Sequence, residues 1–381
     1  MWKYLRMGFA LHLLVLPALY GQITLTSPQE WQVFQRHTQR EGKVEISGHA
    51  ETAADAVEVH LSGTAASAPL QDRWVRLKFQ PASGNFHRSL RVPAGGFYTV
   101  EVRLLRSHVV VATTSVPHVG VGEVFVISGQ SNSTNWGEQQ QTTQTKMVSS
   151  FSGTSWSLAD DPQPGTQDNS TKGSFLPPFG DALVRRYHVP IGIVSVGRGA
   201  TSIRQWLPAG ERVDVLPATS KFIVHDPQKG LVCDGTLFNT MIQRIRQLGP
   251  HGFRALLWDQ GQSDSSLAPE HTISGERFEA MTALVIRRSR KAAGWNFPWI
   301  TAVGTYMNPQ YPSDPSIKRA QRNIWKKGFA IEGPDTDLLT GVYRGKNGMG
   351  VHYNDMGLKA VGAAWAQKVE AYIDTQLKTA P

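Results

Sequence analysis

Hydrophobic periodicity changes once along this chain of 381 residues, near Val119. Before that point apolar residues alternate with polar ones, as in the stretch 57–61. A period of two is typical of strands that bury one face. After that point, short apolar runs alternate with stretches of helical spacing. The sequence therefore predicts two regions of different architecture, an all-β domain at residues 22–118 and an α/β domain at residues 119–381.

The first region is predicted to be a small, Ig-like β-sandwich. Alternating stretches at 44–46, 57–61, 75–79 and 98–104 are separated by turn clusters rich in glycine, proline and small polar residues. Short strands at that spacing favour two packed antiparallel sheets. Nothing in this region suggests chemistry. It would position the second domain, contact a polymer, or serve as a structural appendage.

The second region is predicted to be a doubly wound α/β domain. Its expected buried strands are 124–127, 191–196, 255–258 and 300–303. Its expected helices are 236–248, 276–293, 316–329 and 356–375. Compact apolar runs with helices between them favour a parallel sheet covered on both faces. A polar stretch rich in serine, glycine and proline, 152–178, is expected to be a surface loop that frames a site.

The N-terminus predicts export. Two basic residues precede an apolar run at 7–20, and cleavage after Gly21 would remove residues 1–21 as a signal peptide. The run is too short to span a membrane, and no second run follows it. We therefore expect a secreted or periplasmic protein with no membrane contact after cleavage. The single cysteine, Cys233, leaves the redox compartment open.

The formal charge of +9 is compatible with an acidic partner. However, the basic residues form no stripe interleaved with aromatic residues, which is the pattern of nucleic-acid binding. The densest basic run, 287–291, lies on an expected helix and is interpreted as a solvated face. We therefore expect no nucleic-acid partner.

Polar segments follow three of the expected strands, where parallel sheets bind ligands. Segments 128–133, 197–206 and 259–264 occupy these places, and a fourth segment, 348–354, precedes the last expected helix. A serine beside a helix N-terminus can act as a nucleophile, because free amides there can hold an oxyanion. Taken singly, each segment is equally compatible with a cap, a tight turn or a polar loop.

Together the segments resemble the SGNH hydrolases, and more narrowly the branch with sialate O-acetylesterases and some acetylxylan esterases. The matching motifs are Gly-Gln-Ser-Asn at 129–132, Gly-x-Gly-x-Thr-x-Ile…Trp at 197–206, Leu-Phe-Asn-Thr-Met-Ile at 237–242, Trp-x-Gln-Gly-x-Ser-Asp at 258–264 and Val-His-Tyr at 351–353. The resemblance implies an SGNH-type, flavodoxin-like three-layer sandwich. It also implies a serine esterase that acts on acetylated sialic acid or polysaccharide, with no metal and no cofactor.

The resemblance implies roles for individual residues. Ser131 would be the nucleophile, and His352 would take its proton and return it to the leaving sugar hydroxyl. The backbone amides of Ser131 and Gly199, with the side chain of Gln260, would bind the oxyanion. Neighbouring side chains are expected to bind substrate: Gln130, Asn132, Trp136 and Trp206. For the two tryptophans, stacking on a sugar ring and packing beneath the loops remain alternatives.

The usual orienting carboxylate of this family is missing from both of its positions. Met349 stands three residues before His352, where aspartate is usual, and Gln262 stands where some relatives have glutamate. One solution is a Ser–His dyad, oriented by a backbone carbonyl or by Gln262. A second is a shifted acid, for which the candidates are Asp259, Asp264 and Asp337.

Two further functions fit the same residues. Loss of the acid is compatible with a non-catalytic carbohydrate-binding protein on the same scaffold. Acyl transfer, or hydrolysis of another ester, is also compatible, since a fold does not determine function. We favour the esterase because Ser131 and His352 are both present.

Overall fold

The structure is a computed structural model that describes residues 23–265 and 269–379. The expected signal peptide lies outside the described residues. The strands are β1 (Ile23–Ser27), β2 (Val33–Gln35), β3 (Glu41–Ala50), β4 (Ala56–Ala65), β5 (Val75–Arg76), β6 (Lys78–Gln80), β7 (Asn85–Pro93), β8 (Gly95–Arg106), β9 (Val109–Gly129), β10 (Val148–Phe151), β11 (Trp156–Leu158), β12 (Ile191–Ser195), β13 (Ile223–Asp226), β14 (Gly230–Cys233), β15 (Ala255–Asp259), β16 (Trp299–Val303) and β17 (Ile331–Asp335). The α-helices are α1 (Leu176–Tyr187), α2 (Thr236–Leu248), α3 (Gly275–Ala293), α4 (Pro315–Lys326) and α5 (Asp355–Thr379).

The first part of the described chain consists of strands and their connections, as the period-two pattern predicts. β1, β3, β7 and β6 form one antiparallel sheet. It shares a hydrophobic core with β4, β8 and the first half of β9. The predicted strand 75–79 is in fact two strands, β5 and β6, which pair in different sheets on either side of buried Leu77. Its status as a separate sandwich domain stays a prediction.

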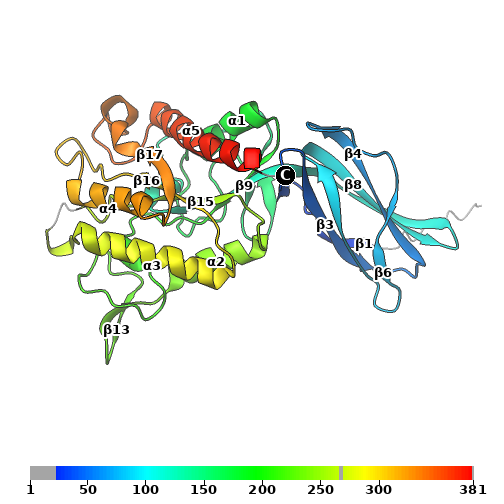
Figure 1. Ribbon diagram of the computed structural model, residues 1–381, viewed down its shortest axis with the longest axis horizontal. Coiled ribbons are helices and arrows are strands. Elements are labelled where there is room, and N and C mark those ends of the chain that lie inside the picture. Colours follow the sequence, from blue (N-terminus) through cyan, green and yellow to red (C-terminus); the bar gives the residue numbers. More distant parts are fainter. Residues whose placement is uncertain (1–22, 266–268, 380–381) are drawn as a thin grey trace, which may run out of the picture.

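Strand β9 runs without a break through the position where the periodicity changes. Its first half pairs antiparallel with β8, and its second half pairs parallel with β12 and β15. Residues 120–122 also pair with β2. The N-terminal strands and the α/β part are therefore joined by a shared strand within one 11-stranded sheet (Figure 1).

The α/β part has a sheet covered by helices on both faces, as predicted. Strands β12, β9, β15, β16 and β17 are parallel neighbours, and numbered along the chain their order is 2-1-3-4-5. This is a doubly wound order. Helices α1 and α5 cover one face, and α2, α3 and α4 cover the other (Figure 1). Val126 and its neighbour Ile127 point to opposite faces, so the strand is buried on both sides.

Six strands and α-helices of this part were not expected from the sequence: β10, β11, α1, β13, β14 and β17. The predicted loop 152–178 is irregular from 159 to 175, but β11 lies near its start and α1 begins at Leu176. Pro177 and Pro178 obscured the start of α1, although the first turn of a helix tolerates proline because its N–H groups have no partner there. Pro334 lies in β17, where the edge of the sheet tolerates it.

Candidate active site

The candidate site lies at the carboxyl ends of β9 and β15, where the strand order reverses. Gly129 ends β9 and pairs with Asp259, which ends β15. A Cβ atom on Gly129 would lie 2.1 Å from the carbonyl oxygen of Asp259, and the φ of Gly129 is +122°. A side chain at this position is excluded by both contacts and backbone conformation. The glycine thus lets the chain turn directly into Ser131, at the start of the short 3-10 helix Ser131–Ser133.

The side chain of Gln130 ties the end of β9 to the segment after β15. Its Oε1 accepts hydrogen bonds from Gln260 Nε2 at 3.0 Å, from the amide of Gly261 at 3.3 Å and from the amide of Ser263 at 3.0 Å. Gln130 is buried. Its position therefore supports a scaffold role beneath the site, and the predicted contact with substrate gains no support.

Ser131 lies beside the segment that carries His352. Its hydroxyl forms no hydrogen bond to any residue in the described parts of the chain, and its side chain is almost buried. The adjacent Asn132 donates from Nδ2 to the carbonyl of Val351 at 3.4 Å. On the other side, the amide of Glu138 donates to the carbonyl of Tyr353 at 2.9 Å. The two predicted catalytic segments therefore meet, although Ser131 and His352 themselves form no hydrogen bond.

Arg344 holds the loop that ends in His352. Its guanidinium donates to the carbonyls of Thr336 at 3.0 Å, Leu339 at 2.5 Å and Val351 at 2.6 Å. The side chain is buried and also lies over the ring of Tyr353, 4.1 Å from its centroid. Several carbonyls bound to one rigid guanidinium restrict the loop. The sequence offered no motif from which this role could be predicted.

The ring of His352 stacks on Trp136. The two centroids are 5.4 Å apart and the planes are inclined by 26°. Trp136 donates from Nε1 to Asp168 Oδ2 at 3.2 Å. Its own side chain is 39% exposed, so one part of the indole faces solvent at the site. Stacking of this kind fixes the plane of an imidazole without a carboxylate partner.

Asp168 was not predicted from the sequence, because it lies in a polar loop that carries no motif. Its Oδ2 accepts the amide of Gly199 at 2.6 Å as well as the indole N–H of Trp136. Its Oδ1 accepts the amide and the hydroxyl of Ser170. The predicted oxyanion donor at Gly199 is therefore occupied by a carboxylate. It can receive an oxyanion only after Asp168 moves away.

His352 is neutral at neutral pH. Its pKa is lowered to about 4, first by burial and then by the positive charges of Arg344, Lys172 and Lys346. Glu138 is the carboxylate that acts in the opposite direction. A neutral imidazole can accept a proton, which is what a general base requires.

Two of the three candidate shifted acids are bound to other loops. Asp264 accepts the Ser202 hydroxyl at 2.5 Å, the amide of Ile203 at 3.0 Å and Gln260 Nε2 at 2.8 Å. Asp337 accepts the amide of Thr305 at 2.7 Å, among other groups. Both carboxylates hold backbone segments in place, and neither forms a hydrogen bond to His352.

The third candidate, Asp259, pairs with Gln262. Gln262 Nε2 donates to Asp259 Oδ1 at 3.2 Å, while Asp259 Oδ2 and Gln262 Oε1 have no partner within the described structure. Burial raises the pKa of Asp259 to about 6. Neither side chain forms a hydrogen bond to His352. No contact in the described structure therefore supports the predicted orienting role of Gln262.

Gln260 and Trp206 are buried around the carbonyl and hydroxyl of Thr201. Gln260 Nε2 donates to the Thr201 carbonyl at 2.7 Å, besides its bonds to Gln130 and Asp264, so an oxyanion would have to displace one of these partners. Trp206 has no exposed surface and donates from Nε1 to Thr201 Oγ1 at 3.1 Å. Of the two alternatives left open for Trp206, its burial agrees with packing beneath the loops and not with stacking on a sugar.

The thiol of Cys233 lies against segment 197–206, where it donates to the carbonyl of Gln205 at 3.5 Å. Cys233 is buried, and burial raises the pKa of its thiol to about 11. Across residues 23–265 and 269–379, no group of three or more His, Cys, Asp or Glu side chains is placed to hold a metal ion. The site as described presents a hydroxyl, an imidazole, backbone amides and an exposed indole.

Comparison with known families gives one match. A family described as "Carbohydrate esterase, sialic acid-specific acetylesterase" matches residues 121–371. The match spans all four of the polar segments that form the site. A search of curated proteins finds no match for the sequence.

Among solved structures, a carbohydrate acetylesterase shows a similar fold. A carbohydrate acetylesterase from Xanthomonas citri has a TM-score of 0.55 at 19% identity, with 92% of this chain and 74% of that chain covered. A protein from Arabidopsis thaliana has a TM-score of 0.44 at 17% identity, with 68% of this chain and 99% of that chain covered. A family two carbohydrate esterase from Clostridium thermocellum, in complex with cellohexaose, has a TM-score of 0.35 at 12% identity, with 91% and 94% covered. At these identities the likeness of the Xanthomonas protein concerns the fold alone.

Proposed function

Because the chain belongs to the carbohydrate esterase family of sialic acid-specific acetylesterases, we propose that it removes O-acetyl groups from carbohydrate through an acyl-enzyme on Ser131. One observation carries this proposal. The serine segment and the histidine segment are far apart in the chain, yet Asn132 reaches the carbonyl of Val351 and Trp136 stacks on His352. These two contacts support a proposed nucleophile and a proposed neutral base in neighbouring segments.

The reaction proceeds in two halves. Neutral His352 takes the proton of the Ser131 hydroxyl as Oγ attacks the acetyl carbonyl carbon, and the tetrahedral intermediate then expels the sugar oxygen. His352 returns the proton to that oxygen, which leaves as a hydroxyl. Water then attacks the acetyl-serine with His352 again as base, and His352 returns this proton to Ser131 Oγ as acetate leaves. The low pKa of His352 keeps its imidazole neutral between these steps.

Backbone amides stabilise the intermediate. The amide of Ser131, at the start of the helical turn, lies next to the nucleophile and is the first donor. The amide of Gly199 becomes the second donor when substrate displaces Asp168 Oδ2 from it, while that oxygen keeps its bond to the indole N–H of Trp136. Gln260 would contribute only by giving up one of its three present acceptors.

We propose that His352 works as part of a dyad in which stacking replaces the missing carboxylate. Trp136 fixes the plane of the imidazole, and Asp168 fixes Trp136 through its indole N–H. Loss of the triad acid costs a serine protease roughly 10⁴-fold in kcat, so an esterase without it is expected to be slower than relatives that retain it.

The substrate class, the identity of the two domains and the export of the protein are also proposals. The exposed edge of Trp136 would stack on the sugar that carries the acetyl group, either a sialic acid or a polysaccharide residue. The α/β part would be an SGNH domain and residues 22–118 an Ig-like sandwich. Export rests on residues 1–21. In the described part of the chain, no helix has the length and apolarity required to cross a membrane.

The test is hydrolysis of 4-nitrophenyl acetate by the protein and by the variants Ser131→Ala and His352→Ala. Both substitutions are expected to abolish turnover. The matched controls Ser220→Ala and His225→Ala change exposed residues outside the site and are expected to retain it. Equal rates in all five proteins would contradict the proposal.

A second measurement separates the alternatives. A serine-directed organophosphonate is expected to label the protein but not the Ser131→Ala variant. Absence of labelling, together with binding of acetylated sugar, would favour a non-catalytic binding protein. Labelling without release of acetate from any acetylated carbohydrate would favour a different ester or an acyl transferase.

A further inference from the structure

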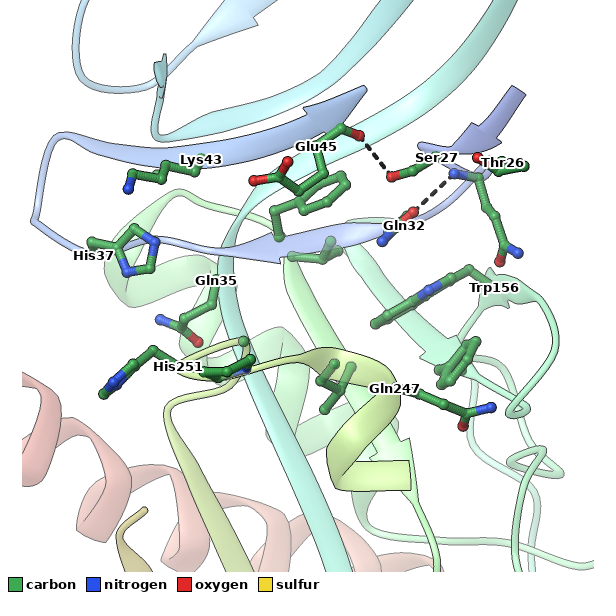
Figure 2. A pocket seen from close by; sticks show the side chains of 18 of the residues that line it. Thr26, Ser27, Gln32, Gln35, His37, Lys43, Glu45, Trp156, Gln247 and His251 are labelled. Atoms are coloured by element: carbon green, nitrogen blue, oxygen red, sulfur yellow. Dashed lines mark hydrogen bonds between the residues drawn. The ribbon is translucent and has the colours of Figure 1, made fainter. Parts of the chain in front are cut away.

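A large groove lies between the N-terminal strands and the α/β part, away from the candidate active site. Its volume is about 1140 Å³, and none of its lining residues belongs to the four polar segments of the candidate active site. Figure 2 shows Lys43 and Glu45 of β3 on one wall and Gln247 and His251 on the opposite wall, with Trp156 between them. Sites for single small molecules enclose about 300–1,000 Å³, so this groove has room for a longer ligand.

The chemistry of the groove is polar but without net charge. Lys43 and Arg91 balance Glu41 and Glu45 among its lining residues. Both acids are already paired, Glu41 with Arg91 at 3.3 Å and Glu45 with His87 at 3.0 Å. The lining also includes amide and hydroxyl side chains that both donate and accept hydrogen bonds: Thr26, Ser27, Gln29, Gln32, Thr38, Thr154 and Gln247.

Aromatic and imidazole rings complete the lining. Trp156 stacks on Phe151 with centroids 5.1 Å apart, and each residue is only 8% exposed, so little more than an edge of the indole reaches the groove. His37 and His251 lie on the rim, and the pKa of His37 is lowered, first by burial and then by the charge of Lys43. Its ring is therefore neutral at neutral pH and offers one donor and one acceptor.

The walls of the groove are held in place by one contact across it and by one contact within the α/β wall. Gln29 donates from Nε2 to the carbonyl of Thr154 at 3.1 Å, and Gln247 donates from Nε2 to the carbonyl of Gly153 at 2.9 Å. Beside the groove, the buried carboxylate of Glu123 binds residues from both parts of the molecule. The groove is thus preformed, which reduces the entropic cost of binding.

We propose that this groove binds a neutral polysaccharide chain. Amides and hydroxyls match the hydroxyl groups of a sugar chain, and the balanced charge disfavours a polyanion. Binding here would hold a polymer on the enzyme while its acetyl groups reach Ser131. That last role rests on the proposed esterase function, whereas the binding itself does not.

The test is affinity electrophoresis of the full chain carrying Ser131→Ala, in gels that contain one deacetylated polysaccharide each. The neutral panel is xylan, β-glucan, mannan and galactan, and polygalacturonate is the anionic comparison. At least one neutral polymer is expected to retard the protein. The further change of Gln32 and Gln247 to Ala is expected to weaken binding about tenfold, as the loss of two ordinary hydrogen bonds implies.

Matched variants keep the test decisive. Gln243→Ala removes an exposed glutamine from the same helix, α2, outside the groove, and is expected to bind as the parent does. Gln32→Ala and Gln247→Ala are also measured singly, and thermal unfolding identifies which variants are folded. No retardation by any neutral polymer, retardation by polygalacturonate alone, or equal binding by all folded variants would overturn the proposal. Polymer binding by a protein without esterase activity would leave it standing.

Discussion

His352 has an environment that favours its neutral form, and this sets the acid limit of the proposed reaction. A base must be neutral to accept a proton, and the pKa of His352 is lowered from 6.5 to about 4 by burial and by neighbouring positive charges. We therefore expect kcat/KM to stay level from about pH 8 to about pH 5 and to fall as the pH falls through about 4. The measurement is a pH–rate profile with 4-nitrophenyl acetate.

Lys172 provides the matched variant for this profile. Because the charge of Lys172 helps to lower the pKa of His352, Lys172→Met is expected to move the acid limb to higher pH. Lys368→Met, which changes a lysine paired with Glu332, is expected to leave it in place. Tryptophan fluorescence at each pH separates protonation from unfolding. An acid limb near 6.5 in the unaltered protein would contradict the low pKa.

Trp136 distinguishes a positioning role from a sugar-binding role. If it holds His352, Trp136→Ala lowers kcat on 4-nitrophenyl acetate, which has no sugar, by about 10²-fold, since small displacements of reacting groups cost about that much. Trp136→Phe keeps a ring against His352 but loses the bond to Asp168. Its kcat is expected to lie between that of the unaltered protein and that of Trp136→Ala. If Trp136→Ala instead raised KM for acetylated polymer and left kcat on 4-nitrophenyl acetate unchanged, Trp136 would be a sugar-binding residue.

Trp31 is the matched control for this series. It stacks on His118 with centroids 3.9 Å apart and an inclination of 4°, outside the candidate site. Trp31→Ala therefore removes the same kind of ring pair without touching His352. We expect its kcat on 4-nitrophenyl acetate to equal that of the unaltered protein, and an equal loss in both variants would point to general destabilisation.

Among the elements, β9 and β15 define the site because they approach closely where they end. Gly129→Ala would place a Cβ atom 2.1 Å from the carbonyl oxygen of Asp259 in a backbone conformation of φ +122°. We expect a loss of about 4 kcal/mol or more in the free energy of unfolding, the range reserved for strain combined with overlap. Urea unfolding followed by tryptophan fluorescence measures it.

A variant at Gly294 separates the two causes of destabilisation expected at Gly129, which are backbone strain and steric overlap. It ends α3 with a φ of +78°, and a Cβ atom there would meet nothing within 4 Å. Gly294→Ala therefore tests backbone strain alone, and we expect a loss of about 1 kcal/mol. Equal losses at the two glycines would mean that the approach of β9 to β15 adds nothing.

The elements also show where the local sequence pattern is enough to predict a strand or a helix. The four central strands of the α/β part were predicted because burial on both faces produces a short apolar run, and the four helices because burial of one face imposes a helical period. β17 was missed because an edge strand tolerates Pro334 and a polar residue such as Glu332. α1 was missed because its opening prolines suggest a loop.

At the scale of the whole molecule, one buried carboxylate joins the N-terminal strands to the α/β part. Glu123 has no exposed surface and binds Arg36 Nε at 2.7 Å and Arg254 Nε at 2.7 Å. Burial alone would raise the pKa of Glu123, but the charges of Arg254 and Arg36 outweigh burial and lower it. The carboxylate thus stays ionised, and its contribution is lost only as the pH falls through the lowered pKa.

Glu123→Gln is expected to cost about 3–5 kcal/mol in the free energy of unfolding at neutral pH, because two buried arginines lose their shared partner. Glu332→Gln breaks an exposed pair with Lys368 and is expected to cost less than about 1 kcal/mol. Urea unfolding measures both. If Glu123→Gln lowered the free energy of unfolding no more than Glu332→Gln, the ion pairs of Glu123 would not stabilise the contact between the N-terminal strands and the α/β part.

The sequence by itself determined the elements whose signals are local: the change of periodicity near Val119, the central strands, and the order of the polar segments behind them. Taken together these segments resemble the SGNH hydrolases, and that resemblance named Ser131 and His352 before their surroundings were known. The family match over residues 121–371 agrees with that reading of the motifs.

Only the tertiary structure decided what surrounds those two residues. It placed Asp168 on the amide of Gly199, Trp136 against His352 and Trp206 beneath the loops. It also carried β9 through the predicted boundary, so that a groove forms where the two regions meet. These contacts join residues distant in the chain through irregular loops, whose paths follow from packing and hydrogen bonding across the whole molecule and leave no period in the sequence.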